Sequence, residues 1–215
     1  MSKIGLIKST GVIGMATAVS RILGFVRDIV IARLFGTAIY AQAFVVAFRI
    51  PNLLRDLVGE GAANAAFVPV LTEELSKKGK KEFFDLAQVI LNILFVVLAA
   101  LTVVGIWASP VIVKLIAPGF ASAPEKFHVT VMLTRILFPF LILAGLWAYS
   151  MGILNSLGYF AAPAYGPCML NLSMILCASW FGENVMGLAS GVLIGGVLQL
   201  LIQLPPLYRL SLIHI

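Results

Sequence analysis

Long apolar runs constrain the fold of this chain more than any other feature of its sequence. Several runs of about 20 residues or more carry almost no charge, and residues 83–116 form the clearest of them. The chain is 61% hydrophobic and only 11% charged over 215 residues, whereas soluble domains carry about 25% charged residues. We therefore expect an apolar surface as well as an apolar core, which places the chain in a lipid bilayer.

The apolar runs predict an all-α, multi-spanning membrane bundle of about six transmembrane helices. The predicted spans are residues 4–34, 41–71, 83–116, 127–154, 167–181 and 185–204. Pro51 is expected to interrupt the second span, and Pro139 lies in the middle of the fourth. Gly187, Gly191 and Gly195 are spaced four apart on one face of the last span, which favours close helix packing.

Basic residues in the short loops predict the orientation in the membrane. With the N-terminus in the cytoplasm, Lys3, Lys8 and the lysine run at 77–81 all lie inside, and Lys114 and Lys126 lie outside. This distribution predicts a multi-pass chain with a cytoplasmic N-terminus.

The last six residues, 210–215, match the translation of an adapter used in transposon-based library preparation. We therefore predict that residues 1–209 form one transmembrane lobe of a longer chain and that residues 210–215 are adapter read-through. His214 is accordingly given no functional role.

Charged residues inside the first two spans are the candidate functional residues. These spans contain five arginines and only three carboxylates. The arginines are Arg21, Arg27, Arg33, Arg49 and Arg55, and the carboxylates are Asp28, Asp56 and Glu60. A charge at bilayer depth costs about 2.5–3.5 kcal/mol on insertion scales, so the surplus positive charge predicts water or an anion beside it. The planar guanidinium fork suits an oxyanion, which favours a diphosphate or carboxylate-bearing substrate. The alternative is that the charges pair and only hold the two helices together.

Helical geometry does not place all of these groups on one stripe. Steps of ~100° per residue put Arg21 and Asp28 within ~20° of each other and turn Arg27 ~120° away from Arg21. Gly24 and Pro51 lie beside the arginines, and a bend at either would turn the guanidinium groups toward a common space.

Other chemistry finds little support in the sequence. It shows no convergent nucleophile, metal-ligand cluster or phosphate-binding glycine loop, so we predict no metal, no cofactor and no catalytic residue. Cys168 and Cys177 lie in apolar surroundings and are predicted to be inert. Asn171 heads a glycosylation-like triplet, which we reject because it lies within an apolar span. The net charge of +6 is spread over loops and spans, which favours a membrane and an anionic ligand over nucleic acid.

An ordered series of motifs resembles the MurJ/MviN family of lipid II flippases. The motifs are residues 20–28 (SRILGFVRD), 32–36 (ARLFG), 47–55 (AFRIPNLLR), 59–61 (GEG), 66–69 (AFVP), 117–120 (APGF), 138–139 (FP), 153–155 (ILN) and 203–205 (QLP). The resemblance extends to about Arg209. It implies the N-terminal lobe of a two-lobed flippase in the multidrug/oligosaccharidyl-lipid/polysaccharide exporter superfamily, with the C-terminal lobe missing here.

The resemblance also implies a function and a set of site residues. The family moves an undecaprenyl-diphosphate-linked peptidoglycan precursor across the bacterial inner membrane by alternating access. Arg21, Arg27 and Arg55 match family cavity arginines expected to engage the diphosphate or headgroup, and we add Arg49 to this substrate-binding set. Glu60 matches a family acidic position expected to act in gating or structure.

Three further residues are assigned to gating or structure. They are Asp28, Gln42 and Pro51. Gln42 stands where many members of the family carry an aspartate, and Asp56 replaces a second basic residue often found after Arg55. Both departures change the local charge that the family pattern implies.

Other functions remain open on the sequence alone. A related exporter of lipid-linked polysaccharide or of drugs shares the fold, but a drug exporter is expected to favour cavity carboxylates over arginines. A membrane enzyme acting on polyprenyl phosphates needs convergent acid–base or metal-binding side chains. A non-transporting membrane scaffold is the third alternative, and the unpaired arginines argue against it because a scaffold does not need unpaired charge in the membrane.

Overall fold

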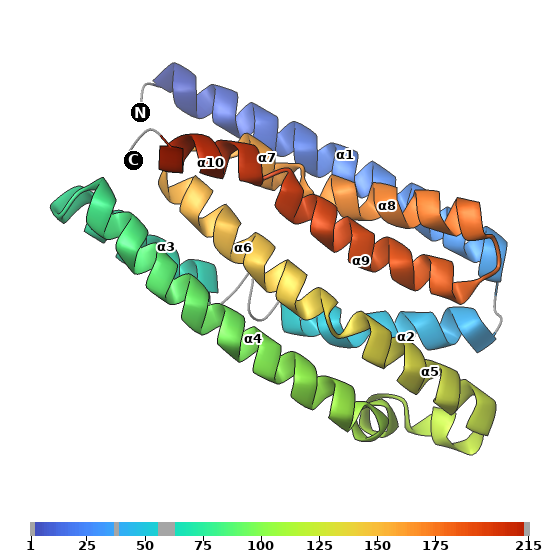
Figure 1. The fold of residues 1–215 in the computed structure, drawn as a ribbon. Helices are drawn as coiled ribbons and strands as arrows, with labels where there is room; N and C mark the ends of the chain where they lie inside the picture. Colours follow the sequence, from blue (N-terminus) through green and yellow to red (C-terminus); the bar gives the residue numbers. More distant parts are fainter. Residues whose placement is uncertain (1–2, 37–38, 56–62, 213–215) are drawn as a thin grey trace.

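The computed structural model describes the backbone of residues 3–36, 39–55 and 63–212, and the side chains of residues 11–36, 39–53 and 69–208. This part of the chain is helical and forms an elongated bundle in which α1 begins and α10 ends at the same end (Figure 1). The elements are α1 Lys3–Phe35, α2 Ile39–Arg55, α3 Ala63–Lys77, α4 Lys80–Ile116, η2 Pro118–Ser122, α5 Pro124–Leu137, α6 Phe140–Ser156, α7 Ala161–Ala164, α8 Gly166–Phe181, α9 Val185–Leu201 and α10 Leu204–Leu212.

Membrane-crossing character is clear in the later helices. Four segments of the described chain are long and apolar enough to cross a membrane: Lys80–Ile116, Pro124–Ser156, Ala161–Phe181 and Val185–Tyr208. On α4 an apolar face points outward, and Trp107 is 85% exposed on it. Such a face is matched by lipid or by another apolar surface. The all-α membrane bundle is confirmed, while the count of about six spans stays a prediction.

The second predicted span differs from the structure at its proline. Pro51 lies inside α2 and is buried, so the expected interruption at Pro51 is wrong. A proline in a membrane helix is tolerated where neighbouring groups absorb the lost backbone hydrogen bond. Instead, α2 ends at Arg55 and α3 begins at Ala63, with residues 56–62 outside the described part.

The fourth predicted span, 127–154, is divided into α5 and α6 at Pro139. Proline lacks the N–H that would continue the helical ladder, and α5 ends at Leu137 just before it. Phe138 is buried at this point against Gly105 of α4, where a Cβ on the glycine would lie 2.0 Å from Phe138 Cε1. Because Gly105 has no side chain, the Phe138 ring at this break packs directly against the backbone of α4.

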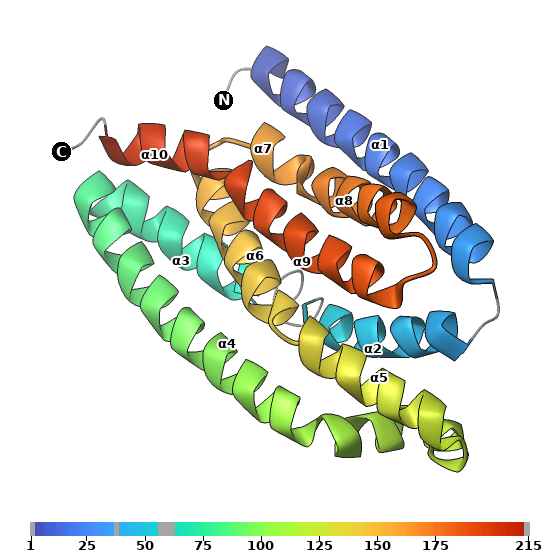
Figure 2. The ribbon, with the colours of Figure 1, turned by 45° about the vertical axis from the view of Figure 1, so that its right-hand side comes forward.

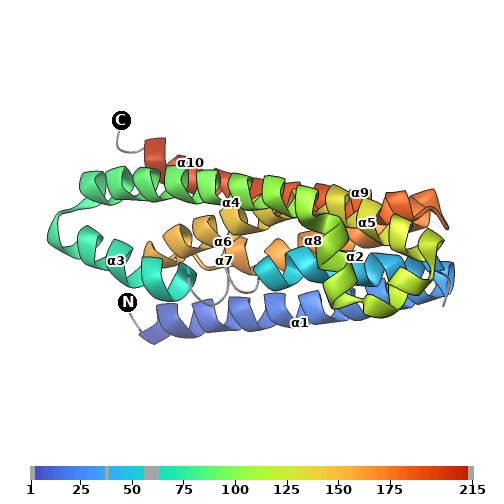
Figure 3. The same ribbon diagram turned by 90° about the horizontal axis from the view of Figure 1, so that it is seen from below.

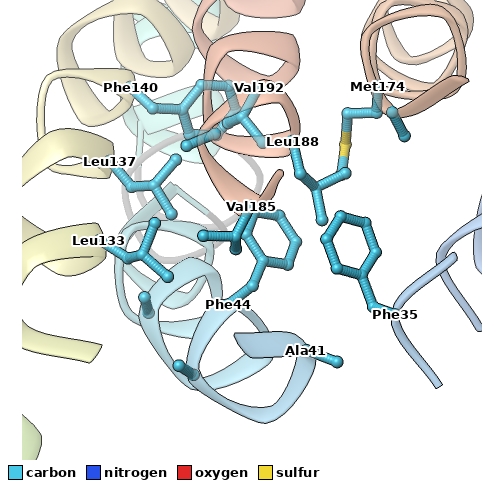
Figure 4. Close-up of a cluster of buried hydrophobic side chains, with 14 of the residues drawn as sticks. Phe35, Ala41, Phe44, Leu133, Leu137, Phe140, Met174, Val185, Leu188 and Val192 are labelled. Atoms are coloured by element: carbon cyan, nitrogen blue, oxygen red, sulfur yellow. The ribbon is translucent and has the colours of Figure 1, made fainter. Parts of the chain in front are cut away.

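One apolar core joins helices that are far apart in sequence. It brings together the end of α1, α2, α5, α6, α8 and α9 (Figure 4). Phe44 and Phe48 of α2 stack at 5.7 Å between ring centroids, and Phe48 meets Phe140 of α6 at 5.9 Å. These rings fasten α2 to the later helices.

Helices α8 and α9 form the tightest pair. A Cβ on Gly195 would lie 2.9 Å from the Cα of Leu170, and one on Gly191 would lie 3.0 Å from the Cα of Met174. The hydroxyl of Ser173 also donates to the carbonyl of Gly191 at 2.9 Å. The close packing predicted from the glycine spacing is confirmed.

Helix α1 lies at the side of the bundle. It contacts α8, which lies between α1 and α9 (Figure 2). Seen from below, α1 occupies one side of the bundle and α4 the opposite side (Figure 3). This arrangement leaves a large part of the α1 surface exposed, including Ile22 and Phe25.

A basic cavity between helices α1 and α2

The second half of α1 and most of α2 enclose a cavity of ≈ 490 Å³. Met174 of α8 closes it on the third side. Most of the wall is apolar, and its polar lining consists of Arg27, Asp28, Arg49 and Asn52. The cavity therefore presents two guanidinium groups and one carboxylate.

Arg27 is held in place by two partners. Its Nε and Nη2 donate to Asp28 Oδ1 at 3.0 and 2.7 Å, and its Nη1 donates to Asn171 Oδ1 at 2.9 Å. The Arg27 side chain is 24% exposed, whereas that of Asp28 is 64% exposed. The arginine is thus held in a partly buried position, while its carboxylate partner has room to turn toward water.

Asn171 is a site residue that the sequence reasoning missed. It lies in α8 and is 7% exposed, with its Oδ1 on Arg27 and its Nδ2 donating to the carbonyl of Ser20 at 3.1 Å. Gly24 lies opposite, where a Cβ would come within 3.6 Å of Asn171 Nδ2. A buried amide in an apolar span must find internal partners, and this rule was the signal that could have found it.

Arg49 has a different setting from Arg27. It is exposed on α2, and neither a hydrogen bond nor an ion pair joins its guanidinium to another described residue. Asn52 lies three residues further along α2 and lines the same cavity. Arg27 and Arg49, one from each of the first two predicted spans, thus line the same cavity, while their assignment to substrate binding stays a prediction.

Arg21 and Arg33, the other predicted arginines whose side chains the structure describes, do not line this cavity. Arg21 is exposed on α1, about two turns before Arg27. Asp28 pairs with Arg27, although the helical angles had placed it nearer Arg21; the long Arg27 side chain reaches its neighbour along the helix. The side chain of Arg55 and the whole of Asp56 and Glu60 lie outside the described residues, so their assigned roles stay predictions.

Gln42 lies near the end of the bundle and contacts α5. Lys126 Nζ donates to Gln42 Oε1 and lies 3.8 Å from the centroid of the Phe120 ring. Gln42, which was assigned to gating or structure, therefore links α2 to α5 through a neutral acceptor.

The charged end of α3 shows only local pairing. Lys77 contacts Glu73 at 2.5 Å and Lys78 contacts Glu74 at 2.9 Å, each pair one helical turn apart. Lys78 donates a hydrogen bond to Glu74, and this bond, together with the negative charge of Glu74, raises the pKa of Lys78. No group of three or more His, Cys, Asp or Glu residues in the described chain could hold a metal ion.

These features define a class: a multi-helix membrane lobe with a basic cavity between its first two helices. The chain belongs to the MurJ family, because the family model described as "Lipid II flippase MurJ" matches residues 31–214.

Similar proteins agree with this assignment. The chain is 41% identical to a "Probable lipid II flippase MurJ" of Buchnera aphidicola subsp. Acyrthosiphon pisum, over 97% of this chain and 42% of that protein. It is 40% identical to the "Lipid II flippase MurJ" of Burkholderia cenocepacia, over 92% of this chain and 39% of that protein.

A solved structure also shares the fold. It is described as "Lipid II flippase MurJ, inward closed conformation" and matches with a TM-score of 0.73 and 29% identity, over 87% of this chain and 40% of that chain. The chain thus spans about two fifths of the length of its relatives.

Proposed function

We propose that this chain is the N-terminal lobe of a flippase for lipid II, the undecaprenyl-diphosphate-linked peptidoglycan precursor. The whole protein moves this lipid from the inner to the outer leaflet of the bacterial inner membrane, with its N-terminus in the cytoplasm. The observation that carries the proposal is the presence of Arg27 and Arg49 in one cavity with a single carboxylate. The names of the relatives support the choice of substrate.

Arg27 supplies a preorganised binding group for a diphosphate. Asn171 holds Nη1, so the guanidinium keeps its direction when Asp28 turns away. A phosphate then takes the place of Asp28 on Nε and Nη2, which form the parallel donor fork that oxyanions prefer. Arg49 faces the same space and binds the second phosphate.

The polyprenyl tail and the headgroup of the substrate are moved without any covalent step. The polyprenyl tail stays in lipid, and the headgroup occupies the space between this lobe and the missing C-terminal lobe of the same chain. Alternating closure of the two lobes then exposes the cavity to each side in turn. No bond is made or broken, so the protein acts as a transporter without a catalytic residue.

The test uses the intact parent gene in a strain whose own flippase can be depleted. Arg27→Ala is expected to abolish growth rescue, with lipid II accumulating in the inner leaflet, while Arg27→Lys keeps partial function because it retains charge but loses the fork. Arg33→Ala is the matched control, since it removes an arginine of the same helix that does not line the cavity. Membrane levels of each variant are measured by immunoblot.

Full rescue by Arg27→Ala at normal protein level contradicts the proposal. Equal loss of rescue in Arg33→Ala also contradicts it, because the effect would then follow from charge on α1 and not from the cavity.

A further inference from the structure

A second basic site lies on α5, outside the α1–α2 cavity. A cavity of ≈ 440 Å³ between α4 and α5 is lined by Arg135 and His128 together with apolar side chains that include Pro110 and Met132. Arg135 is exposed, and neither a hydrogen bond nor an ion pair links its side chain to another described residue. The positive charge on this face is therefore not neutralised by the described chain.

The position of Arg135 along the helix favours an anion beside it. It lies within Pro124–Ser156, a segment apolar enough to cross a membrane. The nearest acidic residue on α5, Glu125, is ten positions away and ~80° round the helix from Arg135. A guanidinium inside an apolar span pairs with an anion or extends to the interface.

The register against α9 places Arg135 relative to the end of that helix. A Cβ on Gly196 of α9 would lie 3.0 Å from Leu143 Cδ1 and 3.1 Å from Phe140 Cδ2, and α6 and α9 run side by side in the same direction (Figure 1). Counting back along both helices places Val185, the first residue of α9, level with about residues 129–132. Arg135 then lies ~5–9 Å inward from that level. Trp180, 86% exposed at the same end of α8, has the position of an interfacial aromatic.

His128 and Arg135 share one face of α5. They are seven residues apart, which turns them by only ~20° relative to each other. The Arg135 guanidinium and the His128 ring line one cavity, so both offer N–H donors to the same ligand.

An apolar groove continues along the same face toward the membrane centre. It has a volume of ≈ 500 Å³ and lies between α6 and α9, with Pro139, Ile142, Ile194 and Val197 among its exclusively apolar lining residues. Ile142 lies seven residues beyond Arg135 and therefore on the same side of the helix. The cavity that contains Arg135 is thus followed along the helix by a groove suited to a hydrocarbon chain.

We propose that this face binds one anionic glycerophospholipid, with its phosphate on Arg135 and His128 and an acyl chain in the α6–α9 groove. The charge of Arg135 selects an anionic lipid over a zwitterionic one. The groove selects a lipid over free phosphate. The site is separate from the α1–α2 cavity and does not depend on the proposed transport function.

The test uses the intact parent protein in detergent, with lipid binding followed by native mass spectrometry. Phosphatidylglycerol is expected to bind at least about tenfold more tightly than phosphatidylethanolamine with the same chains, as a charge-assisted pair implies. Arg135→Gln removes this preference and Arg135→Lys keeps part of it. Lys81→Ala, which deletes an exposed charge at the other end of α4, leaves it unchanged.

A groove variant tests the acyl-chain part of the proposal. Ile194→Trp fills the groove and is expected to weaken long-chain phosphatidylglycerol while leaving short-chain phosphatidylglycerol unaffected. Equal binding of the two headgroups by wild-type protein, or an unchanged preference in Arg135→Gln, overturns the proposal. A structure of the intact protein with a carboxylate of the missing lobe on Arg135 overturns it as well.

Discussion

The α8–α9 pair and the α1–α2 pair show two opposite ways of placing helices in a membrane. Between α8 and α9, glycines bring the backbones so close that a Cβ on Gly195 would lie 2.9 Å from the Cα of Leu170. Between α1 and α2, a cavity of ≈ 490 Å³ contains Arg27 and Arg49. The first pair is built for rigidity, and the second keeps charge available for a ligand.

Asn171 connects the two regions. It belongs to α8, the helix that α9 packs against, and it contacts both Arg27 and the carbonyl of Ser20 on α1. The rigid pair therefore serves as the support that fixes the arginine of the open pair. Substitutions in the α8–α9 contact and at Asn171 test these two roles separately.

The largest loss of stability is expected from a substitution in the close contact between α8 and α9. Gly195→Leu places a side chain against the α8 backbone, and overpacking of this kind costs ~1–3 kcal/mol or more. We expect a strong fall in the melting temperature of the intact protein in detergent and a low level in membranes. Val197→Leu, on an exposed position of the same helix, is the control; similar losses in both variants would contradict the close packing.

A smaller effect is expected from Asn171→Leu. It removes the acceptor of Arg27 Nη1 and the donor to Ser20, so a buried pair of hydrogen bonds worth about 1 kcal/mol each is lost. Growth rescue should require higher expression than the wild type needs. Leu172→Ala, on an exposed position of α8, should rescue normally.

A double-mutant cycle separates positioning from general support. If Asn171 acts through Arg27, an Asn171→Leu change adds little in an Arg27→Lys background. Fully additive losses in rescue would show that Asn171 only stabilises the bundle.

The smallest effect is expected at Gln42. Gln42→Asp converts the hydrogen bond from Lys126 into an ion pair between partly exposed groups, worth about 0–1 kcal/mol. The melting temperature should rise slightly at low salt, and the gain should disappear at high salt. A large fall in the melting temperature would instead show that a neutral acceptor is required between α2 and α5.

Features within one helix were largely predictable from the sequence. The long apolar runs predicted α4, α8 and α9, and the glycine spacing predicted close packing on one face of α9. Each depends on local chain geometry or on the demand that a membrane span be apolar.

Features that join distant helices were not predictable. Arg27 and Asn171 are 144 positions apart, and only the packing of α1 on α8 brings them together. Helical angles paired Asp28 with Arg21 because they ignore side-chain length, whereas Arg27 bends along its own helix to reach Asp28. The interruption expected at Pro51 failed because a proline does not end a helix that its neighbours support.

The most direct test of the account is the binding of lipid II to the purified intact protein. We predict that Arg27→Ala and Arg49→Ala each weaken binding by at least about tenfold, the loss expected for one charge-assisted contact, while binding of undecaprenol, which lacks phosphate, stays weak and equal in all variants. Lipid II binding that is unchanged in both arginine variants would contradict the claim that the cavity between α1 and α2 receives the diphosphate.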